Sequence, residues 1–240
     1  MYKNYIFDLY GTLVDINTDE NKRYLWDKTV HIYKYYGAEY KINEFKEKYK
    51  EFCKEEEAKL NTVDYPEIQL EKVFIRLFKE KGVDISEDIA ICIGKSFRAI
   101  STKYIRLYDG VIDFLENLKK KNKKVYLLSN AQSMFTRSEM DMLHITKYFD
   151  GIVISSDEGC KKPDKKFYEV VLNRYNLNKE ESIMIGNDPI TDIKGSYEVG
   201  IDSLYIHSNI SPKNVKESEL LSKYIVMDGD FRKIEKLILK

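Results

Sequence analysis

Side chains that could carry out hydrolysis follow three short apolar runs of this 240-residue chain. A compact apolar run that ends abruptly in polar or small residues is typical of a buried parallel strand. The polar residues at the three ends are Asp8, Ser129 with Asn130, and Asn187 with Asp188. Ligands of open α/β sheets bind at the carboxyl ends of the strands. We therefore expect hydroxyl, amide and carboxylate groups to meet in one crevice.

Asp8 opens the segment Asp8-Leu9-Tyr10-Gly11-Thr12. An aspartate before Gly-Thr could simply cap the following turn, and for Asp8 alone that interpretation is as good as a catalytic one. A carboxylate at a strand end can also attack phosphorus or carbon and split a hydrolysis into two easier steps through a covalent intermediate. Thr12 would then hydrogen-bond Asp8 or the backbone of the turn, and Gly11 permits a backbone geometry that a side chain would hinder.

The elements that must position these residues alternate along most of the chain. Apolar runs predict buried strands, and apolar residues three or four positions apart predict helices between them. Strands that alternate with helices favour an open, doubly wound, mostly parallel α/β sheet. The five predicted strands are residues 5–9, 125–128, 152–154, 183–185 and 204–206.

The alternation fails over residues 17–103, where the pattern is helical throughout. Four amphipathic segments lie there, and the last begins near Ser86, an N-cap followed by acidic residues that complement the helix dipole. We predict an all-helical cap domain over residues 17–103, inserted into a core of residues 1–16 and 104–240. The many tyrosines of the cap stand at helical spacing, which favours packing over a ligand platform.

Four ordered segments resemble the motifs of the haloacid dehalogenase superfamily. Their order, spacing and strand placement agree with the family, and the resemblance covers essentially the whole chain. The helical insertion after the first motif is similar to the family's first type of cap, on a Rossmann-like core. The resemblance implies a hydrolase with Asp8 as its covalent nucleophile. The segments are Asp8-Leu9-Tyr10-Gly11-Thr12, Leu128-Ser129-Asn130, Lys162-Pro163 and Gly186-Asn187-Asp188-Pro189-Ile190-Thr191-Asp192.

The resemblance also implies roles for the second and third motifs. Ser129 and the adjacent backbone N–H, together with Asn130, would hold a phosphoryl or carboxylate oxygen of the substrate, although Ser and Asn are also common in turns. Lys162 is one of many lysines and could be a solvated surface charge. Before Pro163, at the start of a helix, it looks like the family's buried lysine, which would neutralise clustered anions, contact the substrate and orient the nucleophile.

The fourth motif bears on the reaction type. Asp188 and Asp192 could complement the dipole of a helix start. Beside Asp8 they would bring three carboxylates into one crevice, and repulsion would raise their pKa values unless a cation were present. Mg²⁺ commonly binds one or two carboxylates together with substrate phosphate. We predict Asp8, the backbone carbonyl of Tyr10 and Asp188 as ligands of Mg²⁺, with Asn187 and Asp192 behind them and Asp192 holding the lysine or a metal-bound water.

Two residues depart from the family's phosphatases. Most of these carry a second aspartate two positions after the nucleophile, which protonates the leaving group and then activates water, whereas this chain has Tyr10. Asn187 stands where many have the first acid of the fourth motif, and Asp188 is expected to compensate. Tyrosine at position 10 is the pattern of the 2-haloacid dehalogenases, which need no metal. Lys162 and Tyr168 also match the spacing of that group's lysine and tyrosine.

The leading prediction is a Mg²⁺-dependent phosphatase that acts on a small phosphorylated metabolite through an aspartyl phosphate. Two alternatives stay open: a metal-independent 2-haloacid dehalogenase that forms an aspartyl ester, and a catalytically weak binding or regulatory protein. A missing general acid removes roughly 10²- to 10⁴-fold of rate, so good leaving groups should be preferred unless the Tyr10 phenol donates the proton. The predicted catalytic residues are Asp8, Tyr10, Thr12, Ser129, Lys162 and Asp192.

The composition argues against several other classes of protein. Lys and Arg together number 40, as do Asp and Glu, so no net basic field attracts nucleic acid or an anionic membrane. The three cysteines are irregularly spaced, which fits neither a disulfide framework nor a zinc site. No apolar run approaches the roughly 18 residues that span a bilayer, and the N-terminus lacks a signal-peptide pattern. We expect a cytoplasmic protein without nucleic-acid or membrane partners; the sequence predicts no particular oligomeric state.

Overall fold

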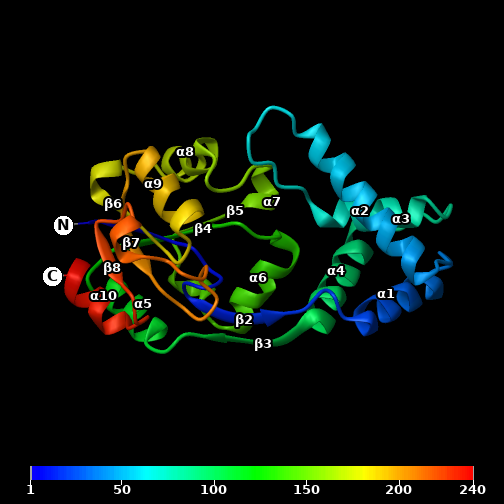
Figure 1. Cartoon of the computed structure of the whole chain (residues 1–240), viewed down its shortest axis with the longest axis horizontal. Helices are drawn as coiled ribbons and strands as arrows, with labels where there is room; N and C mark the ends of the chain where they lie inside the picture. Colours follow the sequence, from blue (N-terminus) through cyan, green and yellow to red (C-terminus); the bar gives the residue numbers. More distant parts are fainter. Residues whose placement is uncertain (1, 240) are drawn as a thin grey trace.

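Six short strands form one parallel sheet in the computed structural model, which describes residues 2–239 (Figure 1). The strand order is β5-β4-β1-β6-β7-β8, with β1 between β4 and β6. The chain crosses from one side of β1 to the other between β5 and β6, so the strand order reverses at the carboxyl end of β1. The strands are β1 (Asn4–Phe7), β4 (Lys124–Ser129), β5 (Gly151–Ile154), β6 (Ser182–Gly186), β7 (Asp202–Ile206) and β8 (Tyr224–Val226).

The predicted fold class is confirmed, and each of the five predicted strands is present. The sixth strand, β8, was missed. It has only three residues and pairs with β7 alone at the edge of the sheet, so two of its side chains are only partly buried. Residues 224–227, Tyr-Ile-Val-Met, are an apolar run that could have indicated this strand.

Helices cover both faces of the sheet because side chains alternate between the two faces of each strand. Tyr5 and Phe7 of β1 pack into one apolar core with residues of α5, α6 and α10. Ile6 points the other way, into a second core with α8 and the segment after α9. The core helices are α5 (Val111–Lys120), α6 (Ser133–Met142), α7 (Ser155–Glu158), α8 (Lys165–Arg174), α9 (Gly195–Glu198) and α10 (Phe231–Ile238).

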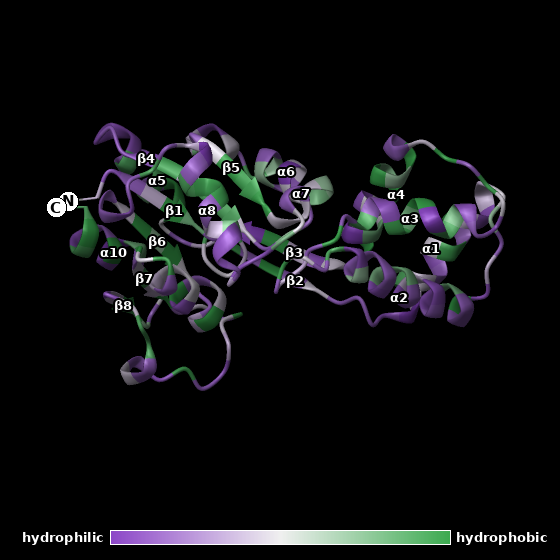
Figure 2. Ribbon diagram, turned by 90° about the horizontal axis from the view of Figure 1, so that it is seen from above, coloured by the Kyte–Doolittle hydropathy of each residue, from purple (hydrophilic) through white to green (hydrophobic). Residues whose placement is uncertain are grey.

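The cap consists of four helices packed around an aromatic cluster, apart from the sheet (Figures 1 and 2). Tyr33 stacks on Phe78 with ring centroids 3.9 Å apart, and its hydroxyl donates to a backbone carbonyl. Packing therefore accounts for Tyr33, as it does for Tyr40 and Tyr49, whereas Tyr24 is exposed. The helices are α1 (Arg23–Tyr35), α2 (Ile42–Lys59), α3 (Leu70–Lys79) and α4 (Glu87–Ser101).

A two-stranded antiparallel ribbon joins the core to the cap (Figure 2). Its strands are β2 (Val14–Thr18) and β3 (Thr102–Leu107). This ribbon was not predicted, and residues 17–18 and 102–103, expected to be part of the all-helical cap, belong to its strands. The alternation of Val14 and Ile16 with polar residues was a strand signal that could have found it. Because β2 follows the loop of Asp8 directly, the cap is attached right beside the predicted nucleophile.

Short helical turns complete the core. They are η1 (Thr146–Tyr148), η2 (Lys179–Glu181), η3 (Pro189–Lys194) and η4 (Glu217–Glu219). Within residues 2–239, none of the helices combines the length and the apolar character that crossing a bilayer requires.

Candidate active site

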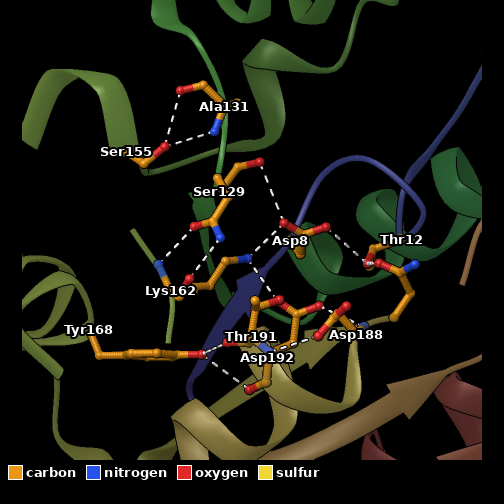
Figure 3. Close-up of polar contacts among 12 residues, drawn as sticks. Asp8, Thr12, Ser129, Ala131, Ser155, Lys162, Tyr168, Asp188, Thr191 and Asp192 are labelled. Carbon is orange, nitrogen blue, oxygen red and sulfur yellow. Dashed lines mark hydrogen bonds and ion pairs between the residues drawn. The ribbon is translucent and has the colours of Figure 1, made fainter. Parts of the chain in front are cut away.

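Asp8 lies just beyond β1, beside the buried ammonium of Lys162 (Figure 3). The backbone N–H of Asp8 donates to the carbonyl of Ile185 in β6 at 3.0 Å, which fixes the residue to the neighbouring strand. Lys162 Nζ lies 2.7 Å from Asp8 Oδ1 and 2.7 Å from Asp192 Oδ1. Burial alone would lower the pKa of Lys162, but the two carboxylates outweigh burial and raise it. The lysine is therefore charged and bridges two acids, and it is not a surface residue.

The backbone of Lys162 is held by the side chain of Asn130. The Lys162 N–H donates to Asn130 Oδ1 at 2.8 Å, and Asn130 Nδ2 donates to the Lys162 carbonyl at 2.9 Å. This amide was expected to bind substrate, and in this structure its hydrogen bonds join the lysine loop after β5 to the end of β4.

Two hydroxyl groups lie close to the carboxylate of Asp8. Thr12 Oγ1 lies 3.4 Å from Asp8 Oδ2, and Ser129 Oγ lies 3.5 Å from Asp8 Oδ1. Both residues are fully buried. Gly11 adopts φ +88°, and a Cβ there would lie 2.4 Å from the Asn187 side chain. The tight turn between Asp8 and Thr12 therefore needs glycine both for its backbone conformation and for its space.

The fourth motif forms the start of η3. Asp188 Oδ1 accepts the N–H groups of Ile190 at 2.9 Å and Thr191 at 2.7 Å, as a helix-capping aspartate does. Its own N–H donates to Asp192 Oδ2 at 2.9 Å, so Asp192 holds both Lys162 and the loop that carries Asp188. The side-chain amide of Asn187 donates to Ser211 Oγ at 3.3 Å.

A pocket of about 320 Å³ opens above these groups. Thr12 and Ser129 are not among its lining residues, whereas most of the other predicted residues line it. Ile210 and Pro212 also line the pocket and were missed from sequence, although both follow β7 and the strand-end rule could have indicated them. A larger hollow of about 920 Å³ shares only Thr12 with the predicted residues. The smaller pocket is lined by Asp8, Tyr10, Asn130, Lys162, Asn187, Asp188, Thr191, Asp192, Ile210 and Pro212.

The phenol of Tyr10 is held by helix α6. It lies 3.0 Å from Thr136 Oγ1 and donates to the carboxylate of Glu139. Burial and the nearby Glu139 charge raise the pKa of Tyr10 well above its usual value. Arg98, near the end of cap helix α4, donates through Nε to Glu139 Oε1 at 2.7 Å, and its guanidinium lies 5.3 Å from the centre of the Tyr10 ring. Neither Glu139 nor Arg98 was identified from sequence.

The cap meets the core at a second place, on the far side of the crevice. Between α2 and α3, Pro66 pairs with Cys160, and the Glu67 N–H donates to the Gly159 carbonyl at 3.2 Å. The Glu67 carboxylate accepts from Gln132 at 3.1 Å and from Ser155 at 3.2 Å. Burial raises the pKa of Glu67.

The oxygen groups of the pocket fit the ligand preference of Mg²⁺. Residues 2–239 contain no group of three or more His, Cys, Asp or Glu side chains that could hold a metal ion. Mg²⁺ needs fewer, because it commonly keeps several waters and binds one or two carboxylates with substrate phosphate. Asp8, Tyr10 and Asp188 line the same pocket. Lys162 already offsets part of the negative charge, so repulsion among the three carboxylates is a weaker reason for a metal than the sequence suggested.

Tyr168 lies away from the pocket. Its hydroxyl donates to the carbonyls of Thr191 and Asp192, the latter at 3.2 Å (Figure 3). A Cβ at Gly195 would lie 2.7 Å from this hydroxyl, which explains the glycine there. The spacing between Lys162 and Tyr168 thus reflects packing of α8 against the fourth motif.

Two known proteins are similar in sequence to this chain over part of their length. The chain is 26% identical over 165 residues to the HAD-hydrolase YfnB of Bacillus subtilis, covering 68% of this chain and 65% of YfnB. It is 25% identical over 116 residues to the glyceraldehyde 3-phosphate phosphatase of Methanothermobacter thermautotrophicus, covering 48% of this chain and 51% of that enzyme. The aligned segments thus span about half to two thirds of these relatives.

Solved structures share the fold over the whole chain. The structure of YfnB bound to magnesium superposes with a TM-score of 0.58 at 18% identity and covers 100% of this chain and 99% of YfnB. A dehalogenase with an intermediate complex gives a TM-score of 0.61 at 16% identity, covering 100% and 98%. The family model of haloacid dehalogenase-like hydrolases matches residues 2–200. As the sequence motifs predicted, the chain belongs to the haloacid dehalogenase-like hydrolases.

Proposed function

We propose that this chain hydrolyses a small phosphorylated metabolite through an aspartyl-phosphate intermediate on Asp8. The observation that carries the proposal is the 2.7 Å contact between Lys162 Nζ and Asp8 Oδ1, in a pocket that also contains Asp188. The ammonium holds one carboxylate oxygen and thereby orients the other. The similarity to an archaeal glyceraldehyde 3-phosphate phosphatase supports a phosphoester as the substrate class.

In the first step, Asp8 Oδ2 attacks phosphorus. The bond between phosphorus and the leaving oxygen breaks, and its electron pair stays with the leaving oxygen. The Ser129 hydroxyl, which lies 3.5 Å from Asp8 Oδ1, would donate to a phosphoryl oxygen once substrate is bound, and the charge of Lys162 offsets the anions that gather around it. Since the Tyr10 phenol is bound to Glu139, the leaving group takes its proton from water.

In the second step, a water molecule attacks the phosphorus of the aspartyl phosphate. The bond from phosphorus to Asp8 Oδ2 breaks, the carboxylate is regenerated, and the protons of the water leave with inorganic phosphate. Lys162 holds Asp8 in place throughout, and Asp192 holds Lys162.

Mg²⁺ is the metal that this donor set would bind, through Asp8, the Tyr10 carbonyl and Asp188. When bound, it would offset the negative charge of the phosphoryl group and align it with Asp8. Two facts support this assignment: the three residues line one pocket, and the related YfnB was solved with magnesium bound.

A 2-haloacid dehalogenase is the second candidate, and the observation that favours it is Tyr10 in the nucleophile loop. Its substrate would carry a carboxylate as well as the halogen. Among the described residues that line the pocket, Lys162 is the only cation, and it already binds two carboxylates. The pocket is therefore better suited to a phosphoester.

The test is a screen of phosphoesters and 2-haloacids with and without Mg²⁺, with Asp8→Asn as the blank. Phosphate release that needs Mg²⁺ and is lost in Asp8→Asn is the expected result. Undiminished hydrolysis by Asp8→Asn would overturn the nucleophile assignment. Halide release without added Mg²⁺ would establish the dehalogenase instead, and silence across the screen would favour a binding protein that retains the fold.

A further inference from the structure

One wall of the active-site pocket is formed by the loop that follows β7, residues 207–213. Ile210 and Pro212 line the pocket from this loop, and both are exposed there. Within residues 2–239, the pocket is lined by no residue of the cap helices. The part of a substrate beyond its phosphate therefore contacts this loop.

Hydrogen bonds on both sides of the wall hold the loop in place. Ser211 Oγ accepts from Asn187 at 3.3 Å and from the N–H of Ser208 at 2.9 Å. Asn209 accepts from the Tyr108 hydroxyl at 2.6 Å and donates to buried Asp15 at 2.9 Å. Ile210 lies between these anchors and Pro212 follows directly after them, so hydrogen bonds fix the backbone that presents both side chains to the pocket.

The charges of the pocket exclude a second anionic group. Of the ten residues that line it, Asp8, Asp188 and Asp192 are acidic and Lys162 is basic. Lys162 is fully buried and lies 2.7 Å from two carboxylates, so it has little capacity for a further anion. Lys213, the next residue along the loop, does not line the pocket.

The cap does not supply the missing cation. Arg98 lies over the ring of Tyr10, but Nε donates to Glu139 at 2.7 Å and Nη2 donates to the same carboxylate at 3.3 Å. A two-point ion pair of this kind neutralises the charge of the guanidinium. A second phosphate or a carboxylate on the substrate would thus meet acidic or apolar groups.

We propose that loop 207–213 selects substrates with a single phosphate and an uncharged, partly apolar remainder, which Ile210 and Pro212 contact. This inference rests on the proposed phosphatase function. It predicts discrimination against substrates with two anionic groups, because this wall of the pocket is formed by the apolar Ile210 and Pro212.

Two matched aryl phosphates test the inference, para-carbamoylmethylphenyl phosphate and para-carboxymethylphenyl phosphate. They differ in one charge at the end remote from phosphorus, and the methylene group insulates the leaving oxygen from that difference. With Mg²⁺ present, we expect kcat/KM to be at least about 10-fold higher for the amide, because the remote carboxylate would meet the apolar side chains of Ile210 and Pro212 and gain no cationic partner there. Ile210→Lys should reduce this preference to about 3-fold or less by providing one.

Leu221→Lys is the control, since Leu221 is half exposed and does not line the pocket. It should keep the wild-type ratio. Pro212→Lys repeats the test at a second position of the wall. Equal kcat/KM for the two esters in the wild type, or a ratio that Ile210→Lys and Pro212→Lys leave unchanged, overturns the inference alone. Release of phosphate from neither ester by folded wild-type protein overturns the proposed function and the inference with it.

Discussion

The phenol of Tyr10 donates a hydrogen bond to the carboxylate of Glu139, on helix α6, although Tyr10 stands only two positions after Asp8. Arg98 of the cap binds the same carboxylate. Glu139 of core helix α6 therefore links the loop after β1 to cap helix α4. A phenol held in this way, with a raised pKa, is a poor proton donor to a leaving group.

Substitution of Tyr10 tests whether acid assistance is absent. Tyr10→Phe is expected to change kcat for an aryl phosphate by no more than about 3-fold, because the ring stays and the lost hydroxyl faces Glu139. Tyr10→Asp should raise the rate for alkyl phosphates by roughly 10- to 100-fold, because it supplies a proton donor. Steady-state kinetics over leaving groups of increasing pKa check both. Rates that do not depend on leaving-group pKa in the wild type, and fall for poor leaving groups in Tyr10→Phe, would show that the phenol is the acid.

Because Lys162 pairs with both Asp8 and Asp192, substitutions at Lys162 and Asp192 should affect stability and activity differently. Lys162→Met leaves two carboxylates without their cation and should lower the free energy of unfolding by about 3–5 kcal/mol. Adding Asp192→Asn removes one of these charges and should recover part of that loss, while phosphate release stays at least about 100-fold below wild type. Urea denaturation and a phosphate assay measure the two effects. Equal stability of the single and double variants would contradict the pairing.

Binding of Mg²⁺ can be measured apart from catalysis. Addition of Mg²⁺ at about ten times its Kd should raise the free energy of unfolding by roughly 1.4 kcal/mol and the Tm by a few degrees. Asp188→Asn should lose most of this shift. Asn is about as good a helix cap as Asp, so the variant should keep its Tm without metal. An equal rise in Tm in both proteins would show that Asp188 does not bind the metal. If activity were unchanged after Mg²⁺ is taken away, the metal would have no part in the reaction.

Glu67 predicts a pH dependence of stability at the contact between cap and core. Burial raises the pKa of Glu67 above its usual 4.5. Between the pKa of the unfolded chain and the pKa of the folded protein, the folded protein binds more protons. The free energy of unfolding therefore falls as pH rises through that interval. Glu67→Gln keeps partners at Gln132 and Ser155 and cannot ionise. It should be more stable at neutral pH by roughly 1 kcal/mol, or about 2–4 °C in Tm.

Thermal melts from acidic to neutral pH measure this effect. The exposed Glu180→Gln provides the matched control, and it should melt as the wild type does at every pH. If Glu67→Gln showed the same loss of stability with rising pH as the wild type, Glu67 would not be the titrating group.

The sequence predicted which strand ends line the pocket, but not the contacts around them. The ends of β1, β4 and β6 were readable because each strand is a buried apolar run and the residue after it is polar. The partners of Tyr10 were not, because Arg98 and Glu139 are far from it in sequence and meet only when the cap packs on α6. A charged residue on an amphipathic helix looks the same in sequence whether it faces water or another helix.

The role of Asn130 shows a second limit of the sequence. Its position at a strand end correctly placed it beside the pocket, but which partner an amide selects depends on the loop that arrives opposite it, here that of Lys162. Ile210 escaped notice for a different reason, since apolar side chains in a loop carry no chemical signal of their own.

The central claim is that Asp8 becomes covalently phosphorylated. The direct measurement is a single turnover with Mg²⁺, quenched in acid and treated with borohydride, which reduces an aspartyl phosphate to homoserine, followed by mass spectrometry of the peptide containing residue 8. We predict homoserine at position 8 at early times in the wild type, in an amount that falls as turnover is completed. Phosphate release by the wild type without any such peptide, and undiminished in Asp8→Asn, would contradict the account.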